Sequence, residues 1–419
     1  MVAKTLPLEL WLKVFQSATD VSGAYTDEDS QAITAFALDQ HGIVAHRQHR
    51  EATNTMIVAL RVCKTWYPLA TSCLFKYLII KSGEHAVSII EYLDLFTACK
   101  TVIPASPRLS AVRLELALQG VHQWEEQHTT AIARIFAMCP NIRVFSTAFL
   151  SGEPMFRDET HFMKTVEHVG MQSHIRRLEL KANDHFVFNI LSRLSPSLKV
   201  LWVLPHQDGG LRPSWETSHL CFPHLHTLVL PHGCRISDGP YSWTAPALRS
   251  LAMPEHLPAF FTAHAPGLER FVSGTGPVNT LDLCTNLTEW TCSTLAIVPA
   301  ISSQLPPRIR VLTIVDEPSD PALATNGGIV LSPTLAYYLH HFLKDPQNLP
   351  FLKRLRLLLP LRRVTTPLLN PHEWRRAFKT LKGACEERDI ALEVSVGIEE
   401  HAANVWKPFL PDDVFLVRP

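Results

Sequence analysis

The stretch Leu198-Lys199-Val200-Leu201-Trp202-Val203 carries the pattern that decides the fold, because its apolar spacing returns along most of the chain. Apolar residues stand at its first, fourth and sixth positions, and a proline often precedes it. Copies of this phrase, some without the last apolar residue, begin at Leu109, Ile142, Ile175, Leu198, Leu225, Leu248, Leu268, Leu287, Ile309 and Leu352. The alternating part of each copy predicts a short strand with apolar residues on one face.

The distance between copies predicts how these strands assemble. From Leu198 to Ile309 the copies begin 19 to 27 residues apart, a period typical of leucine-rich repeats. A single strand of this kind cannot bury its apolar face, so the copies are expected to stack in parallel and share a core. We therefore expect an α/β fold, an irregular leucine-rich-repeat solenoid with parallel strands on the concave face and helices or loops outside. A general α/β domain with scattered leucine-rich strands is the alternative.

The N-terminal region carries a second pattern in two parts, Leu6-Pro7-x-Glu9-Leu10-x-x-x-Val14-Phe15 and Leu60-Arg61-Val62-Cys63-Lys64-Thr65-Trp66. Pro7 suits the first turn of a helix, where its missing N–H would be unpaired anyway. Glu9 lies in the same turn and complements the helix dipole. Apolar residues at helical spacing follow in both parts. Two short helices this apolar cannot bury all of their surface alone, and exposed apolar surface of that kind marks a partner site.

Together the two parts resemble the halves of an F-box, the small all-helical module that docks proteins onto the Skp adaptor of SCF ubiquitin ligases. The resemblance implies a non-catalytic substrate-recognition subunit that reaches a cullin scaffold through the adaptor and presents a client protein held by the repeats. A scaffold without a ligase role is the alternative function. By the resemblance, the residues that bind the adaptor are Leu6, Pro7, Glu9, Leu10, Val14, Phe15, Val62, Cys63, Lys64 and Trp66.

The domain organisation follows from these two patterns. Residues 1–80 form the F-box-like module, with an insertion at about 19–56 in the loop after its first helix. A connecting helix lies within residues 81–105, and the repeat domain occupies residues 106–400. Near its end the spacing predicts a helix over 372–388 and a strand over 389–396, and residues 401–419 form a tail that folds back as a cap.

Residues between the inward-facing leucines are expected on the concave face, where a client protein would bind. Tryptophan and arginine dominate the binding energy of protein interfaces, so we select these residue types at such positions. The candidate client-binding residues are Trp202, Arg177, Arg270, Arg354 and Arg356. For Trp202 the competing interpretation is a side chain that packs beneath a neighbouring loop.

Composition excludes several other classes of protein. Lysine plus arginine and aspartate plus glutamate each total 39, which does not favour a nucleic-acid or anionic-membrane partner. Apolar stretches are too short and too often charged for a transmembrane helix, and the N-terminus lacks the layout of a signal peptide. Nine scattered cysteines favour buried thiols in a reducing compartment. We therefore expect a cytoplasmic or nuclear protein, or one found in both.

Motifs for catalysis are not found in the sequence. It contains no G-x-S-x-G, H-E-x-x-H or P-loop pattern, and we predict no catalytic residue and no cofactor. The run from His219 through Cys221 to His226 contains metal-capable side chains, but it lacks the paired spacing of a structural zinc site, so no metal site is predicted. An enzyme with an unfamiliar site remains an alternative, and it would need a deep pocket with clustered titratable groups.

Overall fold

The computed structural model divides the chain into two compact units, and each is described here separately. The first unit comprises Met1–Gln31 and Leu38–Pro246, and the second comprises Ala32–Ala37 and Ala247–Pro419. The structure describes residues 7–20, 35–98, 111–118, 121–147, 155–156, 160–181, 190–204, 219–230, 243–253, 258–273, 281–293, 297, 305–315, 333–360, 371–397 and 415–417.

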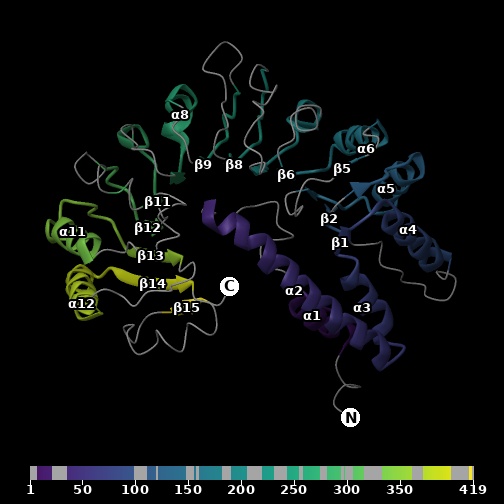
Figure 1. Ribbon diagram of the computed structural model, residues 1–419, viewed down its shortest axis with the longest axis horizontal. Helices are drawn as coiled ribbons and strands as arrows, with labels where there is room; N and C mark the ends of the chain where they lie inside the picture. The colour runs from purple at the N-terminus through teal and green to yellow at the C-terminus, as the bar shows by residue number, and fades with distance from the viewer. Residues whose placement is uncertain are drawn as a thin grey trace. The chain divides into compact units, whose positions relative to one another are not determined.

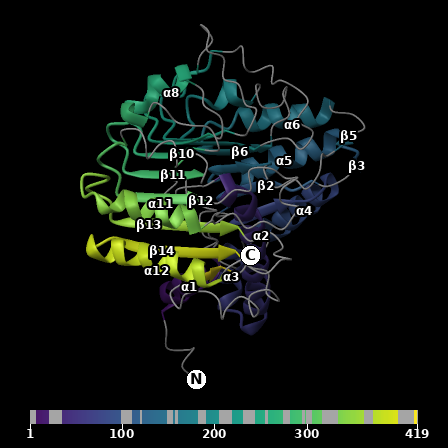
Figure 2. The ribbon, with the colours of Figure 1, turned by 60° about the vertical axis from the view of Figure 1, so that its left-hand side comes forward.

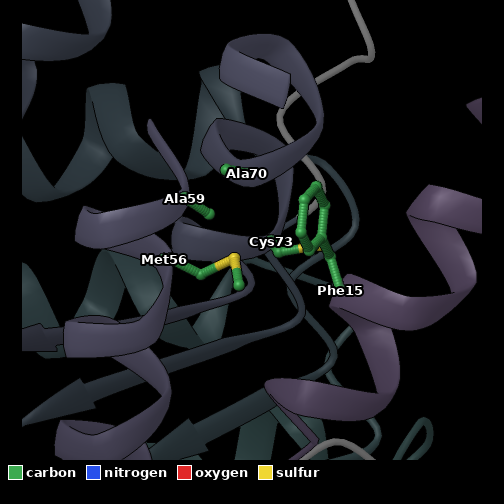
Figure 3. Close-up of a cluster of buried hydrophobic side chains, with 5 residues drawn as sticks. All are labelled: Phe15, Met56, Ala59, Ala70 and Cys73. Atoms are coloured by element: carbon green, nitrogen blue, oxygen red, sulfur yellow. The ribbon is translucent and has the colours of Figure 1, made fainter. Parts of the chain in front are cut away.

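Three helices at the start of the first unit pack around one small apolar core (Figure 3). They are α1 (Leu8–Ala18), α2 (Ala35–Val62) and α3 (Trp66–Leu74). The buried side chains of this core are Phe15, Met56, Ala59, Ala70 and Cys73. We call α1, α3 and the last turns of α2, from Met56 onward, the helical module. Since each helix contributes to the same core, the two sequence motifs fold into one body.

The sheet of the first unit consists of parallel strands that follow one another in chain order. Its register aligns the fourth position of one repeated phrase with that of the next from Phe145 onward, so that Phe145 pairs with Leu178 and Leu178 with Leu201. The phrase that begins at Leu109 is the exception, because it pairs with Phe145 through its sixth position, Leu114. Such alignment stacks the apolar residues into one continuous core, as expected for repeats. The strands are β1 (Tyr77–Ile80), β2 (Arg113–Leu116), β4 (Val144–Ser146), β6 (Arg177–Lys181), β7 (Val200–Leu204) and β8 (Thr227–Val229).

Helices alternate with the first strands of this sheet and lie on one side of it (Figure 1). They are α4 (Gly83–Ala98), α5 (Glu126–Met138) and α6 (Thr160–Gly170). A capping box between Glu125 and His128 fixes the start of α5. The short strands β3 (Val121–His122) and β5 (Met155–Phe156) form a separate parallel pair.

The second unit repeats the same design with parallel strands in chain order. Phe271, Trp290, Leu312 and Leu355 align across neighbouring strands. Its strands are β9 (Ser250–Met253), β10 (Arg270–Ser273), β11 (Glu289–Ser293), β12 (Val311–Val315), β13 (Arg354–Pro360), β14 (Ala391–Gly397) and β15 (Phe415–Val417). Its helices are α8 (Pro258–His264), η4 (Ala265–Gly267), η5 (Leu281–Leu283), α11 (Pro333–Lys344) and α12 (Pro371–Glu387), and Figure 2 shows α11 and α12 beside each other.

The predicted α/β class with parallel strands is confirmed, since each of the ten repeated phrases leads into a strand between β2 and β13. The helix predicted over 372–388 is α12, and the strand predicted over 389–396 is β14. The connecting helix is α4, within residues 81–105 as predicted. Most of the predicted tail lies outside the described residues, but β15 within it pairs with β14.

The structure describes only part of the predicted insertion at about 19–56. Its second part, from residue 35 onward, is the beginning of α2 and continues without a break into the second motif as far as Val62. Residues 21–34 lie outside the described part of the chain. The far end of this helix is anchored by Met56 and Ala59 in the core of the helical module. The polar, histidine-rich sequence of the stretch does not by itself predict a helix of this length.

Candidate functional site

The helical module exposes an unusual share of large apolar side chains. The structure describes twelve exposed large hydrophobic residues, and seven of them lie on α1, α2 or α3. Single exposed apolar residues are normal on a protein surface, whereas a concentration on one small module indicates a contact surface for another protein. We call these seven residues the apolar docking surface: Leu8, Leu10, Val14, Ile57, Val58, Val62 and Tyr67.

Helical spacing explains why these residues are exposed while their neighbours are buried. Leu10 and Val14 are four residues apart and so share one side of α1. They are 44% and 47% exposed, whereas Phe15 is 5% exposed and faces the core. Val58 and Val62 repeat the same spacing on α2 and are 65% and 54% exposed. Each helix therefore has one apolar side for its own core and a second apolar side without a described cover.

An aromatic cluster fixes the orientation of the two motifs toward each other. The ring centroids of Trp11 and Trp66 lie 4.5 Å apart, and those of Phe15 and Trp66 lie 5.1 Å apart in an edge-on arrangement. Aromatic pairs at such separations stabilise beyond the burial of their area. At the end of α1, the Thr19 hydroxyl donates a hydrogen bond of 2.7 Å to the carbonyl of Phe15. The cluster links α1 to α3 and holds both motifs in one rigid unit.

The ten residues predicted to bind an adaptor fall into three groups. Leu6 lies outside the described residues. Phe15 is buried and Trp66 is half-buried, so in this conformation they support the module from inside. The remaining seven lie at the surface: Pro7, Glu9, Leu10, Val14, Val62, Cys63 and Lys64.

The five residues predicted to bind a client are divided between the two units, with Arg177 and Trp202 in the first. Trp202 is 1% exposed, and the guanidinium of Arg177 lies 4.1 Å from its ring centroid. Both are buried within the first unit, so neither offers a surface to a client in this conformation. The cation lies over the face of the indole ring, which is a favourable cation–π contact.

The other three predicted client-binding residues lie in the second unit and are partly exposed. Arg270 forms an ion pair of 3.7 Å with Glu289. Arg354 and Arg356 both bond to Glu393, at 3.0 Å and 2.7 Å. Exposed pairs of this kind contribute little to stability, and their donors remain accessible to a partner.

The first unit contains a buried network of charges that the sequence analysis did not identify. Arg113 donates two hydrogen bonds to Glu179, at 3.0 Å and 2.6 Å, and a third to Glu115 at 3.1 Å. Arg177 pairs with Glu179 at 2.7 Å, and the hydroxyl of Tyr77 donates to Glu115. All four charged side chains are at most 2% exposed. One signal was available, because the tetrapeptide Arg-Leu-Glu-Leu occurs at both 113–116 and 177–180.

The network controls the ionisation of Glu179. Burial by itself would raise the pKa of this carboxyl, but Arg113 and then Arg177 hold the charged form, and the pKa falls to about 2. Burial raises the pKa of the Tyr77 hydroxyl well above its ordinary value. Glu179 therefore stays charged in the folded unit, which suits a structural role between two arginines.

Acidic pH is expected to weaken the first unit through Glu179. Because the pKa of this carboxyl is lower in the folded chain than its ordinary 4.5, the stabilisation is present above pH 4.5 and is lost as the pH falls toward 2. The urea concentration at the midpoint of unfolding should therefore decrease between about pH 6 and about pH 3, and the decrease should be larger for the wild type than for Glu179→Gln. Equal falls in the two proteins would show that Glu179 titrates normally in the folded state.

Groups able to hold a metal are not found among the described side chains. No cluster of three or more histidine, cysteine, aspartate or glutamate residues occurs there. Cys221, in the histidine-rich run, is exposed and forms an isolated strand bridge with Thr244. Within the same described residues, no helix has the length and apolar character needed to cross a membrane.

Comparisons with known proteins identify no relative. No protein-family model matches this sequence, and none of the curated proteins matches it.

Proposed function

We propose that the chain is the substrate-recognition subunit of an SCF-type ubiquitin ligase, with the helical module docking onto a Skp-type adaptor. The observation that carries this proposal is the apolar docking surface. Three of its members, Leu10, Val14 and Val62, are residues that the F-box resemblance assigns to adaptor binding, and each is about half exposed or more. Apolar side chains of this size supply most of the binding energy when a partner covers them.

In this role the protein makes and breaks no covalent bond. The adaptor links it to a cullin scaffold, and the repeat units hold a client protein close to the site of ubiquitin transfer. Tethering of this kind raises the effective concentration of the client at the ligase. Arg270, Arg354 and Arg356 are the candidate client contacts that remain accessible, and the role would be carried out in the cytoplasm or nucleus.

The experiment that tests the proposal measures binding of the full-length chain to a purified Skp-type adaptor. Leu10→Glu and Val62→Glu are each expected to weaken binding by about 30-fold or more, since a buried anchor contributes about 2 kcal/mol and a charge adds a desolvation cost. Leu95→Glu is the matched control, because Leu95 is 67% exposed but lies on α4 outside the module. Its affinity should equal that of the wild type.

Hydrogen exchange separates lost binding from lost folding. The backbone amides of α1 and α3 should remain as protected in both module variants as in the wild type, since the substituted side chains already face solvent. A folded wild-type chain that does not bind the adaptor would overturn the proposal and favour an interaction scaffold without a ligase role. Binding that survives both substitutions would also overturn it, because the docking surface would then be elsewhere.

A further inference from the structure

A cavity of about 540 Å³ lies in the first unit, apart from the apolar docking surface. It is bounded by α2, by the edge strand β1 with the residues just before and after it, and by the first turns of α4. Volumes between about 300 and 1,000 Å³ are typical of small-molecule sites. Nothing in the proposed ligase role requires a cavity at this position.

The polar side of the cavity is basic. Its described lining includes His49, Arg50, Lys81 and His85, and contains no carboxylate. Arg50 and Lys81 are exposed to solvent, and both carry a positive charge at neutral pH. Two cationic side chains in the lining of one cavity, with no carboxylate in the described part of that lining, attract an anionic group.

Neighbouring carboxylates have partners of their own. Glu84 adjoins His85 in the sequence and lies 3.9 Å from the ring of His128. Glu115 accepts hydrogen bonds from Arg113 and from the hydroxyl of Tyr77, whose ring lines the cavity. The carboxylate of Glu115 is thereby directed toward Arg113 and Tyr77, and neither Glu84 nor Glu115 belongs to the described lining of the cavity.

Histidine 85 adds a directed hydrogen-bond donor. Its Nδ1 accepts a hydrogen bond of 3.2 Å from the backbone N–H of Lys81. Burial, followed by the charge of Lys81, lowers the pKa of this imidazole, so the neutral ring is the relevant form at neutral pH. Because Nδ1 accepts, the proton of the neutral ring resides on Nε2, which is thereby a donor.

Apart from Thr53 and Tyr77, the rest of the described lining is apolar and consists largely of residues around β1. Leu74, Phe75, Leu78, Ile79 and Ile89 contribute this part of the wall. A site that combines an apolar wall with a few basic groups at one side selects ligands with both features. Inorganic phosphate would use only the basic side, and a neutral hydrocarbon would use only the apolar wall.

From this geometry we infer that the cavity binds an organic anion with an apolar body, such as an aromatic or aliphatic phosphate ester or carboxylate. The anionic group bonds to Arg50, Lys81 and His85, while the body packs against Phe75 and Leu78. A bound ligand touches α2, β1 and α4 at once. Since α2 also enters the core of the helical module through Met56 and Ala59, occupancy stabilises the attachment of α2 to the first strand.

Calorimetric titration of the full-length chain with 1-naphthyl phosphate tests this inference. The compound is expected to bind. 1-Naphthol, which lacks the phosphate group, and inorganic phosphate, which lacks the aromatic body, are each expected to bind at least about tenfold more weakly. Arg50→Gln and Lys81→Gln should each weaken 1-naphthyl phosphate by about tenfold, the value of one charge-assisted hydrogen bond. Lys164→Gln, at an exposed lysine of α6, is the matched control and should leave the affinity unchanged.

Two results would overturn the inference. One is the absence of detectable binding up to about 1 mM ligand, which corresponds to a free energy weaker than about 4 kcal/mol. The other is equal weakening by Lys164→Gln and by the two cavity variants, which would indicate nonspecific attraction to positive charge. Adaptor binding is measured separately, so failure here leaves the ligase proposal unaffected, and the reverse also holds.

Discussion

Replacing Arg113 with methionine is expected to lower the free energy of unfolding of the first unit by about 3–5 kcal/mol. Arg113 bonds to two carboxylates, Glu179 and Glu115, at distances between 2.6 Å and 3.1 Å. Removing the guanidinium leaves both acids buried with fewer partners, and an uncompensated buried charge is among the costliest defects in a folded protein. Methionine retains much of the volume of the arginine side chain, so the decrease in the free energy of unfolding reports mainly the loss of the positive charge.

The measurement must separate the two units, because they need not unfold together. Hydrogen exchange of the amides in β2 and β6, followed as urea is added, reports on the first unit alone. Arg143→Met is the matched control, since Arg143 is exposed and immediately precedes β4. Its expected change is within about 0.5 kcal/mol. If the Arg113 and Arg143 variants were equally stable, the buried network would be contributing no net stability.

The repeat pattern was predictable from the sequence because one requirement, the burial of apolar residues in a shared core, sets both the spacing of the phrases and the register of the strands. Leu114, Phe145, Leu178 and Leu201 lie in register on neighbouring strands, and a strand that slipped by one residue would turn its leucine to the opposite face. From Phe145 onward these are the residues at the fourth position of the phrase, whereas the copy that begins at Leu109 contributes its sixth residue, Leu114. The strand β1 was missed because Tyr77–Ile80 is apolar throughout and lacks the phrase.

Long-range charge pairing could not be deduced from the same pattern. Arg113 and Glu179 are 66 residues apart and belong to strands with β4 between them. Alternation along the strands predicts that Arg177 and Trp202 lie on an open concave face, opposite the side of Leu178 and Leu201. It does not predict what covers that face, because burial depends on side chains of other strands and helices. The guanidinium of Arg177 over the ring of Trp202 is one contact of this kind.

Part of the candidate docking site was predictable, and part was not. The helical spacing of the first motif separates Leu10 and Val14 from Trp11 and Phe15, yet the motif match assigned Phe15 to adaptor binding as well. The resemblance alone cannot separate residues that shape a module from those that touch its partner. The structure makes that distinction through exposure, since Phe15 is 5% exposed and Val14 is 47% exposed.

Truncating Phe15 to alanine is expected to destabilise the helical module by about 3–5 kcal/mol. The Phe15 ring contacts Trp11 and Trp66, with centroids 6.0 Å and 5.1 Å away, and it packs among the buried residues of α2 and α3. Its removal deletes apolar burial and leaves a cavity that the rigid indole rings cannot readily fill. Protection of the α1 and α3 amides against hydrogen exchange should fall by about 100-fold or more.

Val14→Ala, one residue earlier, is the matched control. The Val14 side chain is half exposed, so its truncation should change the stability of the module by only about 0.5 kcal/mol. The two variants should nevertheless both weaken adaptor binding, Phe15→Ala by unfolding the module and Val14→Ala by removing a contact. Added excess adaptor restores protection in Phe15→Ala by mass action if the module folds on its partner. Equal protection in both variants without adaptor would contradict the assignment of Phe15 to the core.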